Sequence, residues 1–347
     1  MIGDYRRWRS SLTTAGTKTV TTHYRDRKVN CLAFGILLLL STLACAQQWP
    51  VKPVRVIVPF PPGQAVDIIA RLLAERISPS LGQQVLVDNR PGAGTMIGSE
   101  LAAKSPPDGY TFLAGGTSAL AINPHLFPKL GYQTLRDFAP VTNLYSVAYV
   151  FCVNPALPVR TIADLVRLAM RRPGEIIYGS GGIGSTAHLA QEMFASTAGV
   201  KITHVPYKGS VPALTDLIGG QIALVAETTT TVLPHLTAGR LRGIGVSPAM
   251  RVSFLPELAT LAEQGIKDYD VTAWGGLVAP AGTPAPILDR MNAEVVKVLN
   301  APEIRKRLVE EMLATPIGDS REEFLVFLKA ELAKWGNAVK VSGATVE

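Results

Sequence analysis

Cysteine is scarce in this sequence, which has only Cys31, Cys45 and Cys152 among 347 residues. The first two lie in an N-terminal leader, so Cys152 has no partner for an internal disulfide in the rest of the chain. It stands in the apolar run YVFCVNP, which favours a buried, inert thiol over a nucleophile. We therefore expect the protein to be stable without a disulfide, although the leader predicts export.

The leader has the pattern of a signal peptide. Residues 31–46, CLAFGILLLLSTLACA, form an apolar stretch after a basic region, and this stretch is short for a membrane span. Ala44-Cys45-Ala46 matches an A-x-A cleavage site, which would leave Gln47 as the new N-terminus. A lipoprotein anchored through Cys45 is the competing interpretation, although Thr42 stands where a lipobox normally has Leu. Both interpretations predict an exported protein, and cleavage after Ala46 predicts a periplasmic one.

Excess charge is absent outside this leader. The first 46 residues hold seven Lys and Arg against two Asp, which leaves 27 basic and 25 acidic residues in the remainder. This near balance gives no support for nucleic-acid binding. Metal ligands are sparse as well, because His188, His204 and His235 lie far apart with no Cys or carboxylate at metal-binding spacing. We therefore predict no metal, no other cofactor and no nucleic-acid partner.

Short β-rich runs alternate with helical patterns through most of the chain. The series opens with VRVIVPF, AVDIIARLLAERI, QQVLVDN, GTMIGSELAAKS and YTFLAGG, and the second half repeats this rhythm. The alternation predicts an α/β protein with largely parallel sheets. About 300 residues remain after the leader, a length that suits two lobes.

Two strands that end in proline-containing turns are predicted to cross between the lobes. They are YVFCVNP (149–155) and WGGLVAP (274–280), and the sequence after the second is helical. Ser320 and Glu323 form a capping box at the start of the last predicted helix. The predicted division is a signal peptide over 1–46, lobe 1 over 47–148, lobe 2 over 149–273, and a crossing strand with C-terminal helices returning to lobe 1 over 274–347.

A glycine-rich turn at residues 178–190, YGSGGIGSTAHLA, joins a short strand to a helix. Gly179, Gly181 and Gly184 match the G-x-G-x-x-G pattern of dinucleotide sites, and two of them match P-loop glycines. A dinucleotide site needs an acidic residue about 20 positions later, but position 204 is His. A P-loop needs Lys after its last glycine, where this chain has Ser185. The turn therefore does not predict a nucleotide site.

What remains is a helix N-terminus whose free backbone N–H groups and positive dipole suit an anion such as a carboxylate. Ser180, Ser185 and Thr186 add hydroxyl donors to this turn. The simpler alternative is a tight turn in which Ser185 only caps the helix. A comparable loop, residues 60–64, follows the first strand, so we expect two such N-termini to face each other across a cleft. Asp67, in the first turn after that loop, either contacts the ligand or only stabilises its own helix dipole.

The chain resembles the Bug-type receptors of tripartite tricarboxylate transporters over essentially its whole length after the leader. The resemblance rests on VPFPPGQAVDIIAR, VDNRPGAGTMIGSELAAKSPPDGYTFLAG, YGSGGIGSTAHLA, HVPYKGSVPALTDLIGGQI, LPHLTAGRLRGIGVS and AWGGLVAPAGTP. It implies a type II periplasmic-binding-protein fold, with two α/β lobes joined by two crossing strands and a ligand cleft between them. It also implies a monomeric, non-catalytic periplasmic receptor that delivers a carboxylate to membrane transporter subunits. Ligands in this family include di- and tricarboxylates, acidic amino acids and aromatic acids.

The resemblance also implies where the ligand lies. Family receptors hold a ligand carboxyl with main-chain N–H groups of two loops, here residues 59–67 and 179–188. The end of TFLAGGTS and the loop after IALVAE would supply the walls. The residues expected at the ligand are Phe60, Pro61, Gly63, Gln64, Asp67, Thr117, Ser118, Ser180, Gly181, Gly184, Ser185, Thr186, His188, Tyr207, Glu227 and Thr228.

Gln64 and Glu227 depart from the family pattern, and we expect ligand identity to depend on them. Gln64 replaces a second glycine, and Glu227 either disfavours a second ligand carboxylate or accepts an ammonium or hydroxyl group. His188 is expected to support its loop by a hydrogen bond more readily than to act as a base. Trp274 is expected to pack in the hinge or core.

Two other functions remain open from sequence. A receptor of this kind can present its closed form to a signalling partner instead of a transporter. A small-ester hydrolase using Ser180 is the enzymatic alternative, but the chain has no G-x-S-x-G elbow and no evident His and Asp partners in the usual order.

Overall fold

The computed structural model describes residues 49–344, and its helices and strands all belong to the unit that begins at Lys52. The predicted signal peptide, its cleavage site and Cys45 lie outside the described residues. None of the helices within 49–344 combines the length and apolar character needed to cross a membrane.

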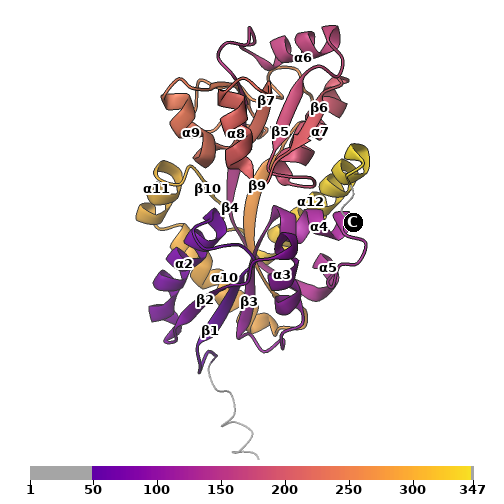
Figure 1. Ribbon diagram of the computed structural model, residues 1–347. Helices are drawn as coiled ribbons and strands as arrows, with labels where there is room; N and C mark the ends of the chain where they lie inside the picture. The colour runs from indigo at the N-terminus through magenta and orange to yellow at the C-terminus, as the bar shows by residue number, and fades with distance from the viewer. Residues whose placement is uncertain (1–48, 345–347) are drawn as a thin grey trace, which may run out of the picture. The chain divides into compact units, whose positions relative to one another are not determined.

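Lobe 1 begins with the predicted alternation of strands and helices (Figure 1). Its parallel strands have the order β2-β1-β3, and the helix α2 connects β1 to β2. The elements are β1 (Val54–Val58), α2 (Ala65–Leu81), β2 (Val85–Asn89), η1 (Ala93–Thr95), α3 (Met96–Ala103), β3 (Thr111–Gly116), η2 (Ser118–Ile122), α4 (Asn123–Leu126) and α5 (Thr134–Asp137).

Two long antiparallel strands, β4 (Phe138–Val153) and β9 (Thr272–Pro280), connect the lobes (Figure 1). The first part of β4 pairs with β9, and its last residues pair with strands of lobe 2. The sequence pattern predicts the first crossing strand at 149–155, but β4 starts at Phe138. Pro140 and two register shifts against β9 interrupt the regular strand pattern there, which explains why the earlier start is not evident from sequence.

Lobe 2 repeats the α/β arrangement. Its strands have the order β4-β7-β5-β6, in which β5 is parallel to both neighbours, and β8 pairs with β4 on the other side. The elements are α6 (Ile162–Arg171), β5 (Ile177–Ser180), α7 (Thr186–Ala198), β6 (Thr203–Pro206), α8 (Ser210–Ile218), β7 (Leu224–Thr228), α9 (Thr229–Thr237) and β8 (Arg242–Val246). The carboxyl ends of β5, β6 and β7 therefore meet at one edge, where the loop 181–185 lies.

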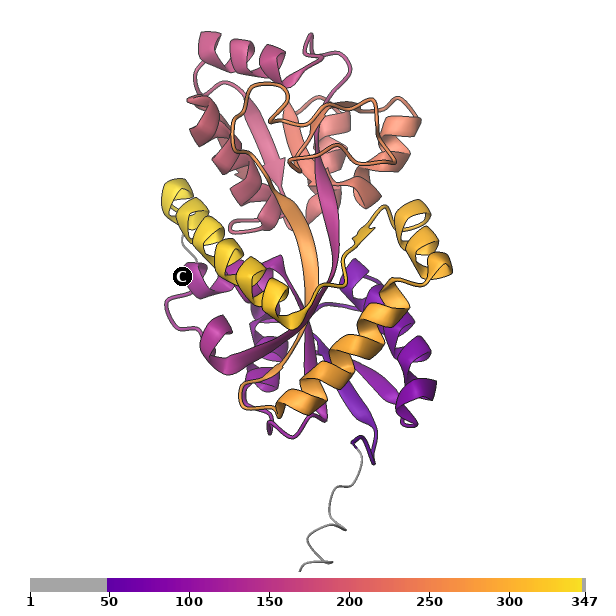
Figure 2. The ribbon, with the colours of Figure 1, turned by 180° about the vertical axis from the view of Figure 1, so that it is seen from behind.

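The remaining elements are α10 (Ala285–Leu299), α11 (Pro302–Glu310), β10 (Thr315–Pro316) and α12 (Arg321–Ser342). Helix α10 packs on α2 in lobe 1. Helix α12 begins with the predicted capping box of Ser320 and Glu323, and it packs on η2 and α4 as well as on α7 of lobe 2 (Figure 2). The C-terminal helix thus contacts both lobes, whereas the sequence indicated only lobe 1.

The largest apolar core cluster continues from one lobe to the other. It includes Ile57 and Leu113 of lobe 1, Phe151 and Phe194 of lobe 2, and Trp335 of α12. Cys152 is buried and free, and burial raises the pKa of its thiol. The prediction of an inert thiol is consistent with this environment.

Candidate ligand-binding site

A pocket of about 200 Å³ lies where the β1–α2 loop, the end of β3, the crossing strands and the start of α7 meet. Residues of both lobes line it, and Gln64, Thr117 and Thr186 are among those predicted from sequence. The lining residues are Phe60, Gln64, Ala65, Val66, Gly116, Thr117, Ser118, Tyr145, Tyr149, Thr186, Ala273 and Trp274. None of them is an Asp, Glu, Lys, Arg or His, so the pocket wall is polar in places but carries no formal charge.

The N-terminus of α2 is open toward this pocket. Gln64 occupies the N-cap position but makes no side-chain cap, and the first helical hydrogen bond runs from Ile68 N–H to the Gln64 carbonyl. Ala65 and Val66 line the pocket, and their N–H groups have no acceptor within residues 49–344. A 17-residue helix therefore presents unsatisfied donors and the positive end of its dipole to whatever occupies the pocket.

Asp67 holds the β1–α2 loop in place instead of lining the pocket. Its carboxylate accepts hydrogen bonds from Gly63 N–H at 2.8 Å, Asn89 Nδ2 at 2.9 Å and Arg71 Nε at 3.0 Å. Burial raises the pKa of Asp67, but these hydrogen bonds outweigh burial and hold the pKa below its usual value. Pro61 and Gly63 are exposed and do not line the pocket. Gly63 adopts a φ angle of +88°.

The loop before α7 uses most of its predicted donors internally. Ser185 Oγ caps the helix by accepting from His188 N–H at 3.2 Å, which is the simpler of the two roles that the sequence allows. The Ser180 hydroxyl is 2.7 Å from His204 Nε2. His188 Nδ1 accepts from Gly184 N–H at 3.1 Å, which is the supporting role expected from sequence. Thr186 is the member of this loop that lines the pocket.

Gly181 and Gly184 of this loop contact other elements. Gly181 lies against the start of α8, next to Ser210. Gly184 has φ +74° and lies against Leu126 of α4, so closely that a Cβ there would overlap the leucine. The two glycines therefore allow close packing of the loop, on lobe 2 in one case and on lobe 1 in the other.

His188 and His204 form a stack behind this loop. Their ring centroids are 4.0 Å apart, and Tyr178, which hydrogen-bonds Glu192, stacks on His204 at 4.8 Å. Burial, together with the neighbouring His204, lowers the pKa of His188 from 6.5 to about 4, and burial also lowers the pKa of His204. A neutral His188 is needed because its Nδ1 accepts the Gly184 N–H.

This arrangement predicts a loss of stability in acid. The unfolded chain binds a proton at His188 at higher pH than the folded chain does. The stabilisation of the folded state by neutral His188 is therefore complete above about pH 6.5, and it is lost as the pH falls through about 4. We expect the free energy of unfolding to decrease over this window by up to about 1.4 kcal/mol per pH unit for this proton. Urea denaturation at several pH values measures this slope. His188→Gln should reduce the slope.

Glu227, Thr228 and Tyr207 do not line the pocket. Glu227 is 6% exposed, accepts from Thr228 N–H at 2.8 Å, and lies beside the Ser210 side chain at the start of α8. Burial raises its pKa, and no Lys, Arg or His pairs with it in the described chain. Thr228 Oγ1 bonds Thr231, and the Tyr207 hydroxyl donates to Asp216 at 2.7 Å. Glu227, Thr228 and Tyr207 are therefore engaged within lobe 2.

Phe60 was predicted from sequence, but the two tyrosines of the pocket wall were not. Tyr145 and Tyr149 lie four positions apart on β4, which places them on the same face of that strand. Recognition of the strand from Phe138 onward would have revealed this pair. Trp274 was expected in the hinge or core, and its indole donates to Glu331 of α12 at 2.6 Å while its ring packs edge-on against Phe327.

A family model described as the tripartite tricarboxylate transporter family receptor, TctC, matches residues 69–343. The chain belongs to this receptor family. BugT of Bordetella pertussis is 36% identical over 320 residues, covering 90% of this chain and 97% of BugT.

Two solved structures are similar over most of the chain. R. palustris Rpa4515, solved with adipate, is 38% identical with a TM-score of 0.74, covering 86% of this chain and 99% of that one. MatC from Rhodopseudomonas palustris, solved with bound malate, is 28% identical with a TM-score of 0.70. The similarity covers 84% of this chain and 100% of MatC. These similarities confirm the predicted family and its α/β periplasmic-binding-protein fold. The family consists of periplasmic substrate-binding receptors and not of enzymes.

The contact between Ser180 and His204 does not give this receptor a hydrolase site. The sequence indicated no partner for Ser180, and the structure supplies one. However, Ser180 is only 1% exposed, and no carboxylate hydrogen-bonds the His204 ring within the described residues. A nucleophile must reach its substrate and its base must be oriented, so this pair fits a structural role in the loop.

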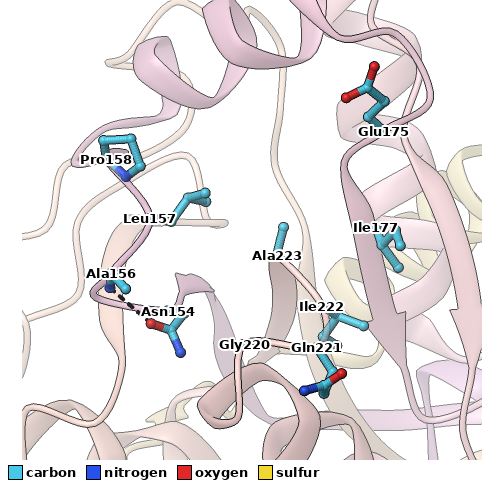
Figure 3. Close-up of a pocket in the computed structure, with 10 residues that line it drawn as sticks. All are labelled: Asn154, Ala156, Leu157, Pro158, Glu175, Ile177, Gly220, Gln221, Ile222 and Ala223. Atoms are coloured by element: carbon cyan, nitrogen blue, oxygen red, sulfur yellow. Dashed lines mark hydrogen bonds between the residues drawn. The ribbon is translucent and has the colours of Figure 1, made fainter.

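A second pocket, of about 350 Å³, lies elsewhere on lobe 2 (Figure 3). It lies by the first residue of β5 and the residues just before β7, at the edge opposite the loop 181–185. Leu157, Ile177 and Ile222 give it an apolar wall, and Asn154 accepts from Ala156 N–H at 2.9 Å beside it. It contains none of the predicted site residues and no open helix N-terminus. The smaller pocket is therefore the candidate ligand site of this receptor.

Proposed function

We propose that the protein is a periplasmic receptor that captures a small carboxylate in the pocket at the N-terminus of α2 and delivers it to the membrane subunits of a tripartite tricarboxylate-type transporter. The observation that carries this proposal is the pair of free N–H groups of Ala65 and Val66 on an uncharged pocket wall. The adipate and malate in the structures of two relatives support a carboxylate as the ligand. The proposed receptor is exported by the predicted signal peptide and acts as a monomer.

The chemistry of capture follows from the lining residues. A ligand carboxylate at Ala65 and Val66 receives charge-assisted hydrogen bonds, each worth about 1.5–3 kcal/mol, and the helix dipole adds up to about 2 kcal/mol in a partly buried site. Ser118 adds a neutral donor from lobe 1, and Thr186 adds one from lobe 2. The Thr117 hydroxyl instead accepts from Trp274 N–H at 3.0 Å and donates to the Trp274 carbonyl. A ligand that contacts both lobes binds their closed arrangement better than an open one, so it shifts the population toward closure.

A thermal-shift screen tests this function. Monocarboxylates, dicarboxylates, tricarboxylates, amino acids, aromatic acids and uncharged sugars are added to the purified receptor, from which the leader has been removed. A carboxylate present at about 100 times its Kd should stabilise the folded state by about 2.7 kcal/mol and raise the Tm accordingly. A shift with an uncharged sugar, with no shift from any carboxylate, would show that the pocket is not an anion site.

A further inference from the structure

Two helix N-termini border the pocket, one from each lobe. The N–H groups of Ala65 and Val66 at the start of α2 have no acceptor within residues 49–344, and the same is true of the Thr186 N–H at the start of α7. Free N–H groups at a helix N-terminus suit carboxylate oxygens. The main chain therefore serves the charged ends of a ligand, and side chains of the lining are left to recognise what lies between them.

Tyr145 lies on the strand that crosses from one lobe to the other. The first part of β4 pairs with β9, and its last residues pair with β7 and β8 of lobe 2. Tyr145 pairs with Gly275 of β9, and its ring covers that glycine so closely that a Cβ there would overlap the ring. Gly275 also pairs with Gly116 of β3, which lies against the ring of Phe60. The tyrosine ring is therefore part of the wall at the junction of the lobes.

The Tyr145 hydroxyl has no hydrogen-bond partner within residues 49–344, although the residue lines the pocket and is only 3% exposed. In the same residues, the fully enclosed side-chain atoms without a partner are Asn143 Oδ1 and His235 Nδ1. The Tyr145 oxygen is not one of them, so it keeps surface that is accessible from the pocket. Burial raises the pKa of this hydroxyl, which therefore keeps its proton at neutral pH. A buried hydroxyl without a partner is costly, so we expect the occupant of the pocket to supply one.

The other polar side chains of the lining do not combine burial with a free hydrogen-bonding group. Thr117 is buried, but its hydroxyl is engaged with the main chain of β9. Gln64 is exposed, and Ser118 and Thr186 are half-buried, so water satisfies them when no ligand is bound. Tyr149 is buried and has the Thr186 side chain as a hydrogen-bonding neighbour. Tyr145 is therefore the side chain of the lining that most needs a ligand.

We propose that Tyr145 is a specificity-determining residue of the pocket, and that its hydroxyl hydrogen-bonds an uncharged oxygen of the ligand. The receptor then prefers carboxylates that carry a hydroxyl or carbonyl oxygen on the carbon skeleton. The carboxylate ends bind at the helix N-termini, and the substituent meets Tyr145. A ligand of the same skeleton without this oxygen leaves the buried hydroxyl unpaired, and a site built to hydrogen-bond a substituent rejects such an analogue. This inference rests on the proposed function and narrows its ligand class.

Isothermal titration of the unmodified receptor at pH 7.5 with matched pairs of acids tests the preference. The pairs are succinate with malate in both enantiomers, glutarate with 2-oxoglutarate, tricarballylate with citrate, and benzoate with 3-hydroxybenzoate. The members of each pair differ by one uncharged oxygen. In the pair that binds best, we expect the substituted acid to bind at least about tenfold more tightly than its parent. Equal or tighter binding of the parent, or no binding by any of the pairs, overturns the inference.

Tyr145→Phe tests whether the hydroxyl causes the preference. We expect the variant to keep the Tm of the ligand-free receptor, because the hydroxyl has no partner in the described chain. Its Kd values for the two members of the best pair should lie within about threefold of each other. A preference that survives in the folded variant contradicts the role of Tyr145. Equal weakening of both acids also contradicts it, since the hydroxyl would then contact the carboxylate that they share.

Tyr269→Phe is the matched control. The Tyr269 hydroxyl is buried and donates to the Ala190 carbonyl at 2.8 Å, and the residue does not line the pocket. We expect this variant to have a lower Tm and an unchanged preference within the pair, which is the reverse of the result expected for Tyr145→Phe. Loss of the preference in both variants would assign the effect to altered packing and overturn the inference.

The same titrations separate this inference from the proposed function. If an uncharged ligand binds and no carboxylate does, the proposed function itself fails. If carboxylates bind without a preference for the additional oxygen, only this narrower inference fails.

Discussion

Replacing Ala65 with proline is expected to weaken carboxylate binding by about tenfold or more and to leave the receptor folded. Proline has no N–H group, so the variant lacks one of the two free donors at the N-terminus of α2. Loss of a hydrogen bond to a charged group costs about 1.5–3 kcal/mol, which corresponds to about 10- to 150-fold in Kd. The helix should tolerate the change, because Ala65 is its first residue and proline is favoured there, and Gln64 already has ψ 160°.

Matched variants separate the lost donor from added bulk. Ala65→Val enlarges the side chain while keeping the N–H group, and Ala65→Gly keeps the N–H group with less bulk. Isothermal titration with the best carboxylate should show a loss of affinity in Ala65→Pro that clearly exceeds the loss in Ala65→Val. Equal losses in these two variants would assign the effect to steric exclusion and not to the backbone donor.

Asp67→Ala is expected to lower both stability and ligand affinity. The substitution leaves the Gly63 N–H and the Asn89 amide without their buried acceptor, and each such loss costs about 1–3 kcal/mol. We expect a loss of about 2–5 kcal/mol in the free energy of unfolding, measured by urea denaturation. The affinity should also fall, because the loop that positions Ala65 and Val66 loses its anchor.

Asp164→Ala provides the control for Asp67→Ala. Asp164 is also a first-turn acid, and it accepts from Arg160 N–H at 3.0 Å and Thr161 N–H at 3.1 Å at the start of α6, away from the pocket. Its removal should cost about 0.5–2 kcal/mol of stability and leave ligand affinity unchanged. If both variants lower affinity equally, Asp67 acts only through global stability and not through the β1–α2 loop.

The alternating strand and helix patterns predicted the fold class, and the resemblance to a known receptor family predicted the loops of the candidate site. Alternating strands and helices place the loops 59–67 and 179–188 at the carboxyl ends of parallel strands. Gln64, noted as a departure from the family pattern, and Thr186, noted as a donor of the glycine-rich turn, both line the pocket. Spacing along the chain is sufficient for such features, since each loop is defined by its own strand and helix.

The direction of individual side chains was not predictable in the same way. Ser180 and Ser185 carry donors in a loop at the site, yet Ser180 contacts His204 and Ser185 caps its own helix. Asp67 faces Asn89, which is 22 residues away in the sequence. Such choices depend on tertiary partners that a local pattern does not contain.

The two tyrosines of the site, Tyr145 and Tyr149, were missed for a different reason. Tyr145 precedes the predicted start of the crossing strand, because the bulges near Pro140 and Asn143 interrupt the alternation that marks a strand.

Backbone amide shifts in ¹⁵N-labelled receptor give the most direct test of the central claim, which is that a ligand carboxylate binds at the N-terminus of α2. The spectrum is recorded while the tightest-binding carboxylate from the screen is added. We predict that the Ala65 and Val66 amide protons move strongly downfield as they form charge-assisted hydrogen bonds. Saturable binding in which these two amides do not shift, while amides elsewhere do, would contradict the claim.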